Sequence, residues 1–489
     1  MIDWLVRQNG ISLHHMTDPN QTFLSAAKAL LGPSGWSDDS ERLRRHAAPW
    51  RGTYVGHTPF VGSPASTEEA AALVKLCAEH SVAMTPQGGN TGLVDGGTPH
   101  GEICVSMTRM TEIRDVDTLN NSLIIEAGAT LALAQQAAQE ADRMFPLSLG
   151  SEGTATIGGL ISTNAGGVAV LRYGMMRDLI LGLEVVLPSG EVWSGLSGLR
   201  KNNTGYDLKH LFAGAEGTLG LITAATLKLF PKVQTASAWI SCQQADDIIA
   251  LLAHIRSYAG DAVTSFEMIP ANGIDMVCAD HADVRDPAPS DIPWRVLCEV
   301  SLPTSEMANE VLEKALASAF ERGLLVDAQI AASGIQAARF WRIRETIPLS
   351  KRAYGTSINH DISVPVSAIP AFLKDCAKAV GEIAPQAEIV AFGHVGDGNL
   401  HYSACEPAKT PQPVLQDIAA DITRTVHRIT MQYGGSISAE HGVGRLKRDE
   451  LTEIRSPVAT AAMVAIKRAI DPQNIMNPGR VVASDAPSA

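Results

Sequence analysis

The sequence has no excess of basic residues: its 489 residues include 39 Lys and Arg against 52 Asp and Glu. A net charge of −13, with no block of Lys and Arg to offset it, argues against a nucleic acid partner. The chain also lacks an apolar run of about 18 residues, so we expect no membrane-spanning segment. Its start has no long apolar stretch of the kind found in signal peptides. Because Met16 would also make a natural start, we expect residues 1–15 to be an unstructured extension.

Clustered cysteines are absent as well. The seven cysteines lie singly, and no Cys-x-x-Cys pair marks an iron–sulfur cluster or a zinc knuckle. An odd number of scattered cysteines is typical of a reducing compartment, so we expect an intracellular, cytoplasmic protein. What is present is a globular composition, with 45% hydrophobic and 19% charged residues, in a chain long enough for two or three domains.

Hydrophobic periodicity and turn signals divide the chain near residue 232. Up to that point short strands alternate with glycine-rich loops, whereas beyond Pro231 strands alternate with amphipathic helices. We expect helices over 21–31, 67–80, 131–141, 244–258, 305–322, 367–383, 414–432 and 457–470. We expect strands over 103–107, 113–117, 122–127, 183–187 and 191–194.

Two glycine-rich segments of the first half are candidate ligand-binding loops. Consecutive glycines in Pro86–Gly92 allow backbone N–H groups to converge on a phosphate, although for this loop alone an ordinary turn is an equally good interpretation. A second such segment over 148–167 favours a large ligand close to the main chain. Neither segment has the pattern of a Rossmann or a P-loop site, and both of those sites are therefore disfavoured.

Two histidines flank an Asp-Gly pair in the second half. Asp397-Gly398 between short apolar runs is typical of a two-residue hairpin turn. That turn would pair His394 with His401, with Cβ atoms about 5 Å apart on one face. Two imidazoles in this arrangement can share a metal ion. A cross-strand pair of histidines without a metal is the commoner case, however.

Three further residues could complete a site. Glu440 could add a third ligand to the two histidines and leave one coordination position open, as in catalytic zinc sites. His441 would then lie beside the metal as a candidate general base. Arg344 could hold a carboxylate through two hydrogen bonds, or could simply pair with Glu345 on a solvent-exposed helix.

Taken in order, seven segments resemble a known family. It comprises the flavin-dependent D-2-hydroxyacid dehydrogenases, including D-lactate and D-2-hydroxyglutarate dehydrogenases, within the vanillyl-alcohol oxidase-like superfamily. The segments extend over nearly the whole chain, from about residue 46 to residue 482. They are Pro86–Gly92, Asn164–Gly167, Lys201–Leu211, Gly214–Gly220, Phe392–His401, Gly434–Gly444 and Asn477–Gly479.

The resemblance implies an α+β fold with a PCMH-type FAD-binding domain and a cap domain built on an antiparallel sheet with helices. The implied parts are an N-terminal extension with helices (1–55), the FAD-binding domain (56–232), the cap domain with the metal site (233–455), and a C-terminal helix and tail returning to the FAD (456–489). The residues implied to hold FAD are Pro86, Gly88, Gly89, Asn90, Thr91, Gly92, Leu93, Gly150, Ser151, Thr154, Gly158, Gly159, Asn164, Gly166, Gly217, Gly220, Ile222 and Asn477. Relatives with covalent FAD often use a His in the first glycine loop. Since this loop has Asn90 and no His, we expect non-covalent FAD.

The implied reaction is the oxidation of a D-2-hydroxy acid, such as D-2-hydroxyglutarate or D-lactate, to the 2-oxo acid, with hydride transfer to the flavin. A divalent metal, zinc in the first instance although Mn or Fe would also suit the ligands, would bind the substrate hydroxyl. The implied metal ligands are His394, His401 and Glu440. The implied catalytic residues are His441 and Arg344. The implied substrate-binding residues are Arg344, Asn359, Ser403 and His441.

Three substrate-side positions depart from the family pattern. The 2-hydroxyglutarate enzymes usually have Thr, Lys and Asn where this chain has Pro348, Asn359 and Ser403. The identity of the acid therefore stays open, and Lys351 or Arg352 could replace the missing cation if the helix continues beyond Pro348.

Several alternatives also stay open. The rival functions are a metal hydrolase, a non-redox flavoenzyme such as an alkyl-transferring synthase of the same superfamily, and a catalytically weakened flavin-binding homologue. The electron acceptor could be an electron-transfer flavoprotein, a quinone or oxygen. A homodimer is one of the assemblies that the sequence leaves open.

Overall fold

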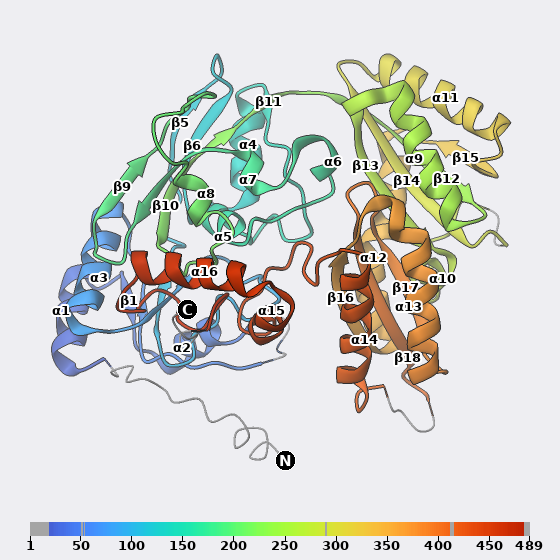
Figure 1. Cartoon of the computed structure of the whole chain (residues 1–489). Helices are drawn as coiled ribbons and strands as arrows, with labels where there is room; N and C mark the ends of the chain where they lie inside the picture. Colours follow the sequence, from blue (N-terminus) through green and yellow to red (C-terminus); the bar gives the residue numbers. More distant parts are fainter. Residues whose placement is uncertain (1–18, 50–51, 53, 289–290, 411–414, 484–489) are drawn as a thin grey trace.

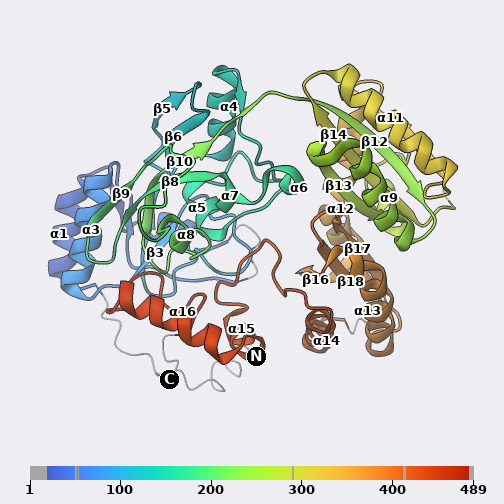
Figure 2. The same ribbon diagram turned by 45° about the horizontal axis from the view of Figure 1, so that its top comes forward.

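The computed structural model describes residues 19–49, 52, 54–288, 291–410 and 415–483, and the extension expected over 1–15 lies outside them. Two halves lie side by side (Figures 1 and 2). The chain passes into the second half between Pro231 and Gln234, and returns to the first half after residue 432. Among the described helices, none is both long and apolar enough to cross a bilayer.

The first half contains three sheets. A mixed sheet has the order β1 (Trp36–Ser37), β2 (Val61–Gly62), β4 (Ile103–Ser106), β3 (Met84–Gln87). An antiparallel sheet has the order β5 (Ile113–Asp117), β6 (Ser122–Glu126), β10 (Leu221–Lys228), β8 (Ile180–Val186), β9 (Val192–Gly195). A third, two-stranded sheet pairs β7 (Arg143–Met144) with β11 (Phe230–Pro231).

Ten helices surround these sheets in the described part of the first half. The earlier eight are α1 (Gln21–Leu31), α2 (Ser40–Ala47), α3 (Thr67–His80), α4 (Leu131–Glu140), α5 (Ile157–Thr163), α6 (Val170–Tyr173), α7 (Met176–Leu179) and α8 (Lys209–Phe212). The last two, α15 (Arg448–Ile454) and α16 (Pro457–Ile470), belong to the returning end of the chain and lie with the first half in both views (Figures 1 and 2).

The second half is built on one antiparallel sheet of seven strands. Their order is β15 (Asp327–Ile330), β12 (Gln234–Cys242), β14 (Trp294–Leu302), β13 (Val263–Pro270), β17 (Glu388–His394), β18 (Asn399–Pro407), β16 (Gly355–Ser363). Its helices are α9 (Ala245–Ala259), α10 (Ala271–Asp280), α11 (Ser305–Glu321), α12 (Gly334–Tyr354), α13 (Ile369–Ile383) and α14 (Ala419–Gln432), with 3-10 turns η1 (Gly260–Ala262) and η2 (Val366–Ala368).

The two faces of this sheet differ in character because successive strand residues point to opposite sides. One face is apolar and packs against α9, α11, α13 and α14, with Ala238, Phe266 and Tyr402 among its buried residues. The opposite face packs partly against α10 and α12, around Trp239 and Phe392. The charged and polar residues of the candidate site lie on this second face.

The chain end is anchored in the first half by a buried lysine. The Nζ of Lys467 on α16 donates to the carbonyl oxygens of Thr218 and Met476, both at 2.8 Å, and to Asp471 Oδ2 at 2.5 Å. Beyond α16 the backbone pairs with β3, since Met84 N donates to Ile475 O and Asn477 N to Met84 O, both at 2.8 Å. This pairing carries Asn477 to the start of the first glycine loop.

Local signals predicted the bounds of several elements well. The helices expected over 21–31, 67–80 and 457–470 and the strand over 113–117 are confirmed with the same bounds. Helix α3, for example, begins where Ser66 Oγ accepts from the backbone N–H of Glu69.

Two of the differences occur at helix starts that lack a side-chain cap. Helix α13 starts two residues later than expected, after η2, and α14 starts at Ala419, whereas residue 414 lies outside the described residues. Helix α12 continues for 21 residues straight through Pro348.

Candidate functional site

The two glycine-rich loops of the first half, Pro86–Gly92 and the one over 148–167, pack closely against each other. A Cβ on Gly88 would lie 2.0 Å from Thr156 Oγ1, and a Cβ on Gly89 would lie 1.8 Å from the carbonyl oxygen of Thr154. Neither position can therefore carry a side chain without moving its neighbour. Glycine is needed here because two expected cofactor loops meet.

The other expected cofactor segments gather at the same place. A Cβ on Gly217, which has φ +72°, would lie 3.1 Å from the ring of Pro86, and one on Gly214 would lie 3.4 Å from Asn164. Asn477 Nδ2 donates to the carbonyl oxygens of Gly96 and Glu216 at 2.9 and 2.7 Å. All four expected cofactor segments therefore border one region.

Individual members of the expected set differ in what they face. Gly92 and Gly150 have open space where a Cβ would be. Gly220 and Ile222 instead pack into the core of the first half, and the side chain of Asn90 donates to the carbonyl oxygen of Ala48 at 3.0 Å. The remaining members of the set are Leu93, Thr91, Ser151, Gly158, Gly159 and Gly166, which belong to the same loops and to α5.

Two buried polar atoms in this region have no hydrogen-bond partner among the described residues, namely Thr156 Oγ1 and Asn477 Oδ1. Buried polar atoms are normally hydrogen-bonded, and an unpaired one often marks the place of a bound ligand or water. A polar ligand lying against these loops would supply the missing partners. The region therefore fits a large polar cofactor.

The hairpin between β17 and β18 differs from the one expected. Phe392 pairs with His401, so the expected pairing of His394 with His401 is wrong by two residues. His394 instead pairs with Glu267 on β13. The connection spans four residues, 395–398, because the Asp397 side chain accepts from the backbone of the next strand and lengthens the turn.

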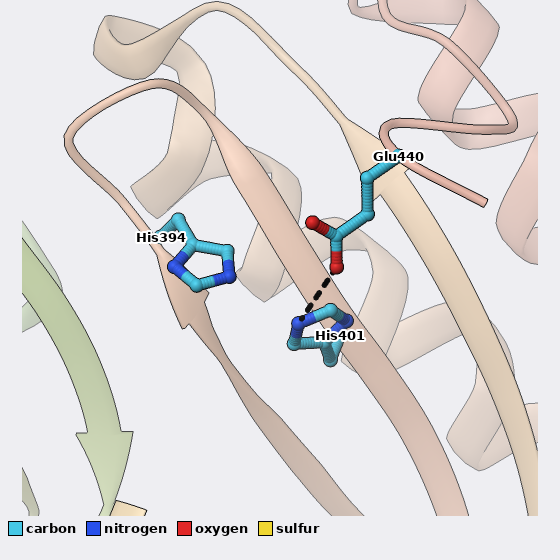
Figure 3. Close-up of side chains that lie close together, drawn as sticks. All are labelled: His394, His401 and Glu440. Carbon is cyan, nitrogen blue, oxygen red and sulfur yellow. Dashed lines mark ion pairs between the residues drawn. The ribbon is translucent and has the colours of Figure 1, made fainter. Parts of the chain in front are cut away.

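A shift of two residues leaves both histidines on the same face of the sheet. Their ring centroids are 5.6 Å apart. Glu440 reaches this face from the returning segment, and its Oε1 lies 3.7 Å from His401 Nε2 (Figure 3). The structure thus brings His394, His401 and Glu440 together, with one ligand atom of each within 4.8 Å of the others.

These three side chains fit a divalent cation. A tetrahedral ion about 2.1 Å from each donor would set the donors about 3.4 Å apart, which requires only a small closure of the observed group. Asp361, Glu440 and His441 also come within 4.8 Å of one another. Asp361 already accepts from Asn399 Nδ2 and from the backbone N–H groups of Glu440 and His441, so the first group is the better cation site.

A buried carboxylate that the sequence analysis missed orients this group. Glu267 Oε1 lies 2.6 Å from His394 Nδ1, and its Oε2 accepts from Arg344 Nε at 2.7 Å. Burial would raise the pKa of Glu267, but the charges of His394 and Arg344 hold that pKa at about 2. With Nδ1 held by Glu267, His394 has its Nε2 left for a metal. The available signal was a single charged residue within the run Val263–Pro270, which has no other charge.

Arg344 is buried and pairs with Glu267, whereas Glu345 is exposed on the same helix, so the alternative pairing with Glu345 is wrong. Its side chain is 7% exposed, and its guanidinium lies 4.7 Å from the centroid of the Phe392 ring. Apart from the bond to Glu267, it makes no hydrogen bond with the described residues. Its terminal nitrogens can therefore hold a ligand carboxylate beside the histidines.

The other expected substrate residues meet around a lysine. Lys351 Nζ donates to Asn359 Oδ1 at 2.8 Å and to Ser403 Oγ at 2.5 Å, and lies 5.1 Å from the Phe392 ring centroid. Lys351 follows Arg344 by two turns of α12, so both cations lie on one side of this helix. This arrangement depends on the helix continuing through Pro348.

The general-base candidate lies next to the histidine pair. The ring of His441 stacks on that of His401 at a centroid distance of 6.4 Å, and its Nδ1 is 3.6 Å from Asp361 Oδ2. A cavity of about 730 Å³ lies between the two halves, and His441 and the histidine pair are not among the residues that line it. Asn164 and Glu216 line it from the first half and Glu440 from the returning segment. One member of the expected cofactor set, Asn164, and one expected metal ligand, Glu440, therefore border a common space.

Known families match both halves of the chain. The FAD binding domain family matches residues 59–195, and the family of FAD linked oxidases, C-terminal domain, matches residues 232–481. D-2-hydroxyglutarate dehydrogenase of Stutzerimonas stutzeri (strain A1501) is 35% identical over 96% of this chain and 100% of its own length. The mitochondrial D-2-hydroxyglutarate dehydrogenase of Arabidopsis thaliana is 35% identical over 94% of this chain and 81% of its own length.

Solved structures share the fold. p-Cresol methylhydroxylase is similar with a TM-score of 0.74 at 18% identity, over 96% of this chain and 98% of that one. An alkyldihydroxyacetonephosphate synthase is similar with a TM-score of 0.73 at 19% identity, over 95% of this chain and 86% of that one. The expected α+β fold, with a PCMH-type FAD-binding domain and a cap on an antiparallel sheet, is confirmed.

Replacing Glu267 tests its part in orienting His394, the expected metal ligand. In Glu267→Gln the amide can accept from only one of its two partners, and the negative charge beside Arg344 is lost. We expect zinc affinity to fall by about 10- to 100-fold, the usual effect of losing such a partner, with FAD content unchanged. Zinc binding is measured by competition with a chromophoric chelator.

Glu299→Gln is the matched control for this variant. Glu299 is also a buried carboxylate of this sheet, but it bonds to Ser237 and Trp341 and not to a histidine. We expect its zinc affinity to equal that of the wild type. A Glu267→Gln protein that binds zinc as tightly as the wild type would rule out the orienting role.

Proposed function

Because the chain belongs to the family of FAD-linked oxidases that includes the D-2-hydroxyglutarate dehydrogenases, we propose that it oxidises a D-2-hydroxy acid to the 2-oxo acid. The chain is an FAD-linked oxidoreductase. The observation that carries the choice of substrate is the group of His394, His401 and Glu440 beside the buried Arg344. A cation on this surface can bind a substrate hydroxyl while the arginine beside it binds a neighbouring carboxylate, and a 2-hydroxy acid carries both groups on adjacent carbons.

The glycine loops of the first half would hold FAD without a covalent bond, since Asn90 occupies the first loop where a His could attach it. When bound, FAD would supply the acceptor for a hydride from C2, and a divalent cation, zinc in the first instance, would supply a Lewis acid for the hydroxyl. The first half, over 56–232, would thus serve as the FAD-binding domain, and the second, over 233–455, as the substrate domain.

Each side chain of the site has a distinct role in the proposed reaction. The terminal nitrogens of Arg344 bind the substrate carboxylate and fix C2 in place. His441 takes the hydroxyl proton on Nε2, and Asp361 beside its Nδ1 stabilises the imidazolium that forms. Glu267 keeps both Arg344 and His394 in position.

Three further predictions complete the proposal. Electrons would leave the reduced protein for a separate acceptor, either an electron-transfer flavoprotein or a quinone. The cytoplasmic location and the homodimer remain predictions from the sequence. Among the rival functions, a metal hydrolase would leave the glycine loops without a role. The two rivals that remain are a non-redox flavoenzyme and a catalytically weakened flavin-binding homologue, and neither would transfer a hydride to the flavin at a normal rate.

Anaerobic mixing with a panel of 2-hydroxy acids tests the function. We expect D-2-hydroxyglutarate or D-lactate to bleach the flavin absorbance, and their L-enantiomers to leave it unchanged, because the fixed carboxylate allows only one face of C2 to meet the flavin. A protein that contains FAD and zinc but is bleached by no acid of the panel would be a non-redox or weakened homologue.

Removing the metal should separate cofactor binding from chemistry. His401→Ala lacks one of three ligands, and such a loss usually destroys a metal site. We expect this variant, or chelator-treated wild type, to lose bleaching while most FAD stays bound at micromolar protein. Zinc-free protein that bleaches at the untreated rate would contradict the role of the metal.

The His441→Ala variant tests the general base. A general base contributes about 10²- to 10⁴-fold, and we expect the rate of flavin reduction to fall by that factor with unchanged FAD and zinc. The residual rate should rise with pH as hydroxide replaces the base. If zinc is lost instead and excess zinc restores the rate, His441 serves only to orient Glu440.

Lys351→Met tests which acid is bound. We propose that Lys351, at Asn359 and Ser403, receives the second charged group of a dicarboxylic hydroxy acid. Removing a buried cation from such a pair costs at least about 2 kcal/mol, so KM for D-2-hydroxyglutarate should rise about 30-fold or more, with little change for D-lactate.

Arg352→Met is the control, because Arg352 is the adjacent cation of α12 but is exposed. We expect its KM values to stay near those of the wild type. Equal effects of Lys351→Met on both acids would contradict a role in selecting the second group.

A further inference from the structure

The backbone of residues 440–444 is held between two buried carboxylates from different halves of the molecule. This segment is part of the connection between α14 and α15, which passes between the halves in both views (Figures 1 and 2). It carries Glu440 and His441 at one end and two glycines at the other. Its position therefore decides where the proposed ligand and base lie.

Asp361 on β16 holds the first end of the segment. Its Oδ2 accepts from the backbone N–H groups of Glu440 at 3.0 Å and of His441 at 2.9 Å. Its Oδ1 accepts from Asn399 Nδ2 at 2.9 Å, so the carboxylate is itself fixed to the sheet. Asp361 also pairs with His401 across the strands. The Asp361 carboxylate thus positions Glu440, the proposed third ligand, next to His401, the proposed second ligand.

Glu216 holds the other end from the first half. Its Oε1 accepts from Val443 N at 2.7 Å and its Oε2 from Gly444 N at 2.8 Å. A Cβ on Gly442, which has φ +83°, would lie 2.8 Å from Glu216 Oε1, so glycine is required for this contact. The contact is close, buried and made through both oxygens.

Glu216 lies among the segments expected to hold FAD. Its backbone N–H donates to Ser162 O on α5 at 2.8 Å, and its carbonyl oxygen accepts from Asn477 Nδ2 at 2.7 Å. The next residue, Gly217, packs on Pro86. A cofactor that holds these segments in one conformation also holds the carboxylate of Glu216 in place.

We propose that residues 440–444 couple the two sites, so that FAD and the metal ion each bind more tightly when the other is present. This coupling rests on the proposed function for the identity of the two ligands. FAD fixes the loop that carries Glu216, Glu216 fixes Val443 and Gly444, and the short segment then presents Glu440 to the histidines. Coupling between two binding sites is reciprocal, so the metal must strengthen FAD binding by the same factor.

FAD release from the holoenzyme measures this coupling. Zinc-loaded and chelator-treated samples of the full chain are diluted, and free FAD is followed by its fluorescence to give a dissociation constant for each sample. We expect zinc removal to raise the dissociation constant of wild-type FAD by about 5- to 150-fold, the usual range for coupled sites. Far-UV circular dichroism verifies that the folded fraction is the same in each sample.

Two variants interrupt the contact from its two sides. Glu216→Gln turns an N–H donor toward Val443 N or Gly444 N, and Gly442→Ala places a methyl group against Glu216. In both we expect zinc removal to change the FAD dissociation constant by less than twofold. Glu184→Gln is the control, because Glu184 is a buried carboxylate of the first half that bonds to Thr223 and not to this segment. It should keep the wild-type ratio.

The coupling is overturned if zinc changes the wild-type FAD dissociation constant by less than twofold, or if both contact variants keep the wild-type ratio, or if Glu184→Gln loses it. Bleaching by D-2-hydroxy acids on the same samples keeps the two proposals apart. Wild type that bleaches without the zinc effect overturns only the coupling. Wild type that shows the zinc effect without bleaching overturns only the proposed reaction.

Discussion

The site depends on a balance of buried charges on one face of the seven-stranded sheet. A buried charge is strongly destabilising unless another charge or hydrogen bond compensates it. Here two carboxylates have donors within hydrogen-bond distance: Glu267 has Arg344 and His394, and Asp361 has backbone N–H groups and Asn399. The pairing fixes geometry as well as charge, because moving one partner leaves another uncompensated. The ring of His394 and the backbone of Glu440, both proposed to bind a metal, are therefore held in place.

The sequence predicted this site better than it predicted the hairpin that carries it. The expected pairing of His394 with His401 was wrong by two residues, yet both lie on the same face because an even shift preserves the alternation of a strand. A shift of one residue would have buried one histidine in the apolar layer. The side of the sheet was thus predictable from parity, whereas the register depended on how Asp397 lengthens the turn.

What the sequence could not predict is set by contacts between distant segments. Local caps and periodicity predicted helices such as α3 and α16, and the glycine-rich loops indicated a large ligand. Glu267 lies far in sequence from both of its partners, and nothing near it marks it as more than a charged residue in a strand. The same holds for Glu216 and Asp361, whose partners are backbone N–H groups that carry no side-chain signature.

Helix α12 explains how the chain can depart from the family pattern at the positions expected to bind substrate while the rest of the candidate site is kept. Arg344 lies on its first part, next to Glu267 and the histidine pair, and Lys351 lies two turns further on, next to Asn359 and Ser403. The Phe392 ring lies within 5.1 Å of both cations and so joins the two ends of one surface. Exchange of residues at the Lys351 end leaves the hydrogen bonds of Glu267 untouched. In the proposed reaction, the chemistry and the choice of acid would thus depend on different turns of one helix, so that each could change without the other.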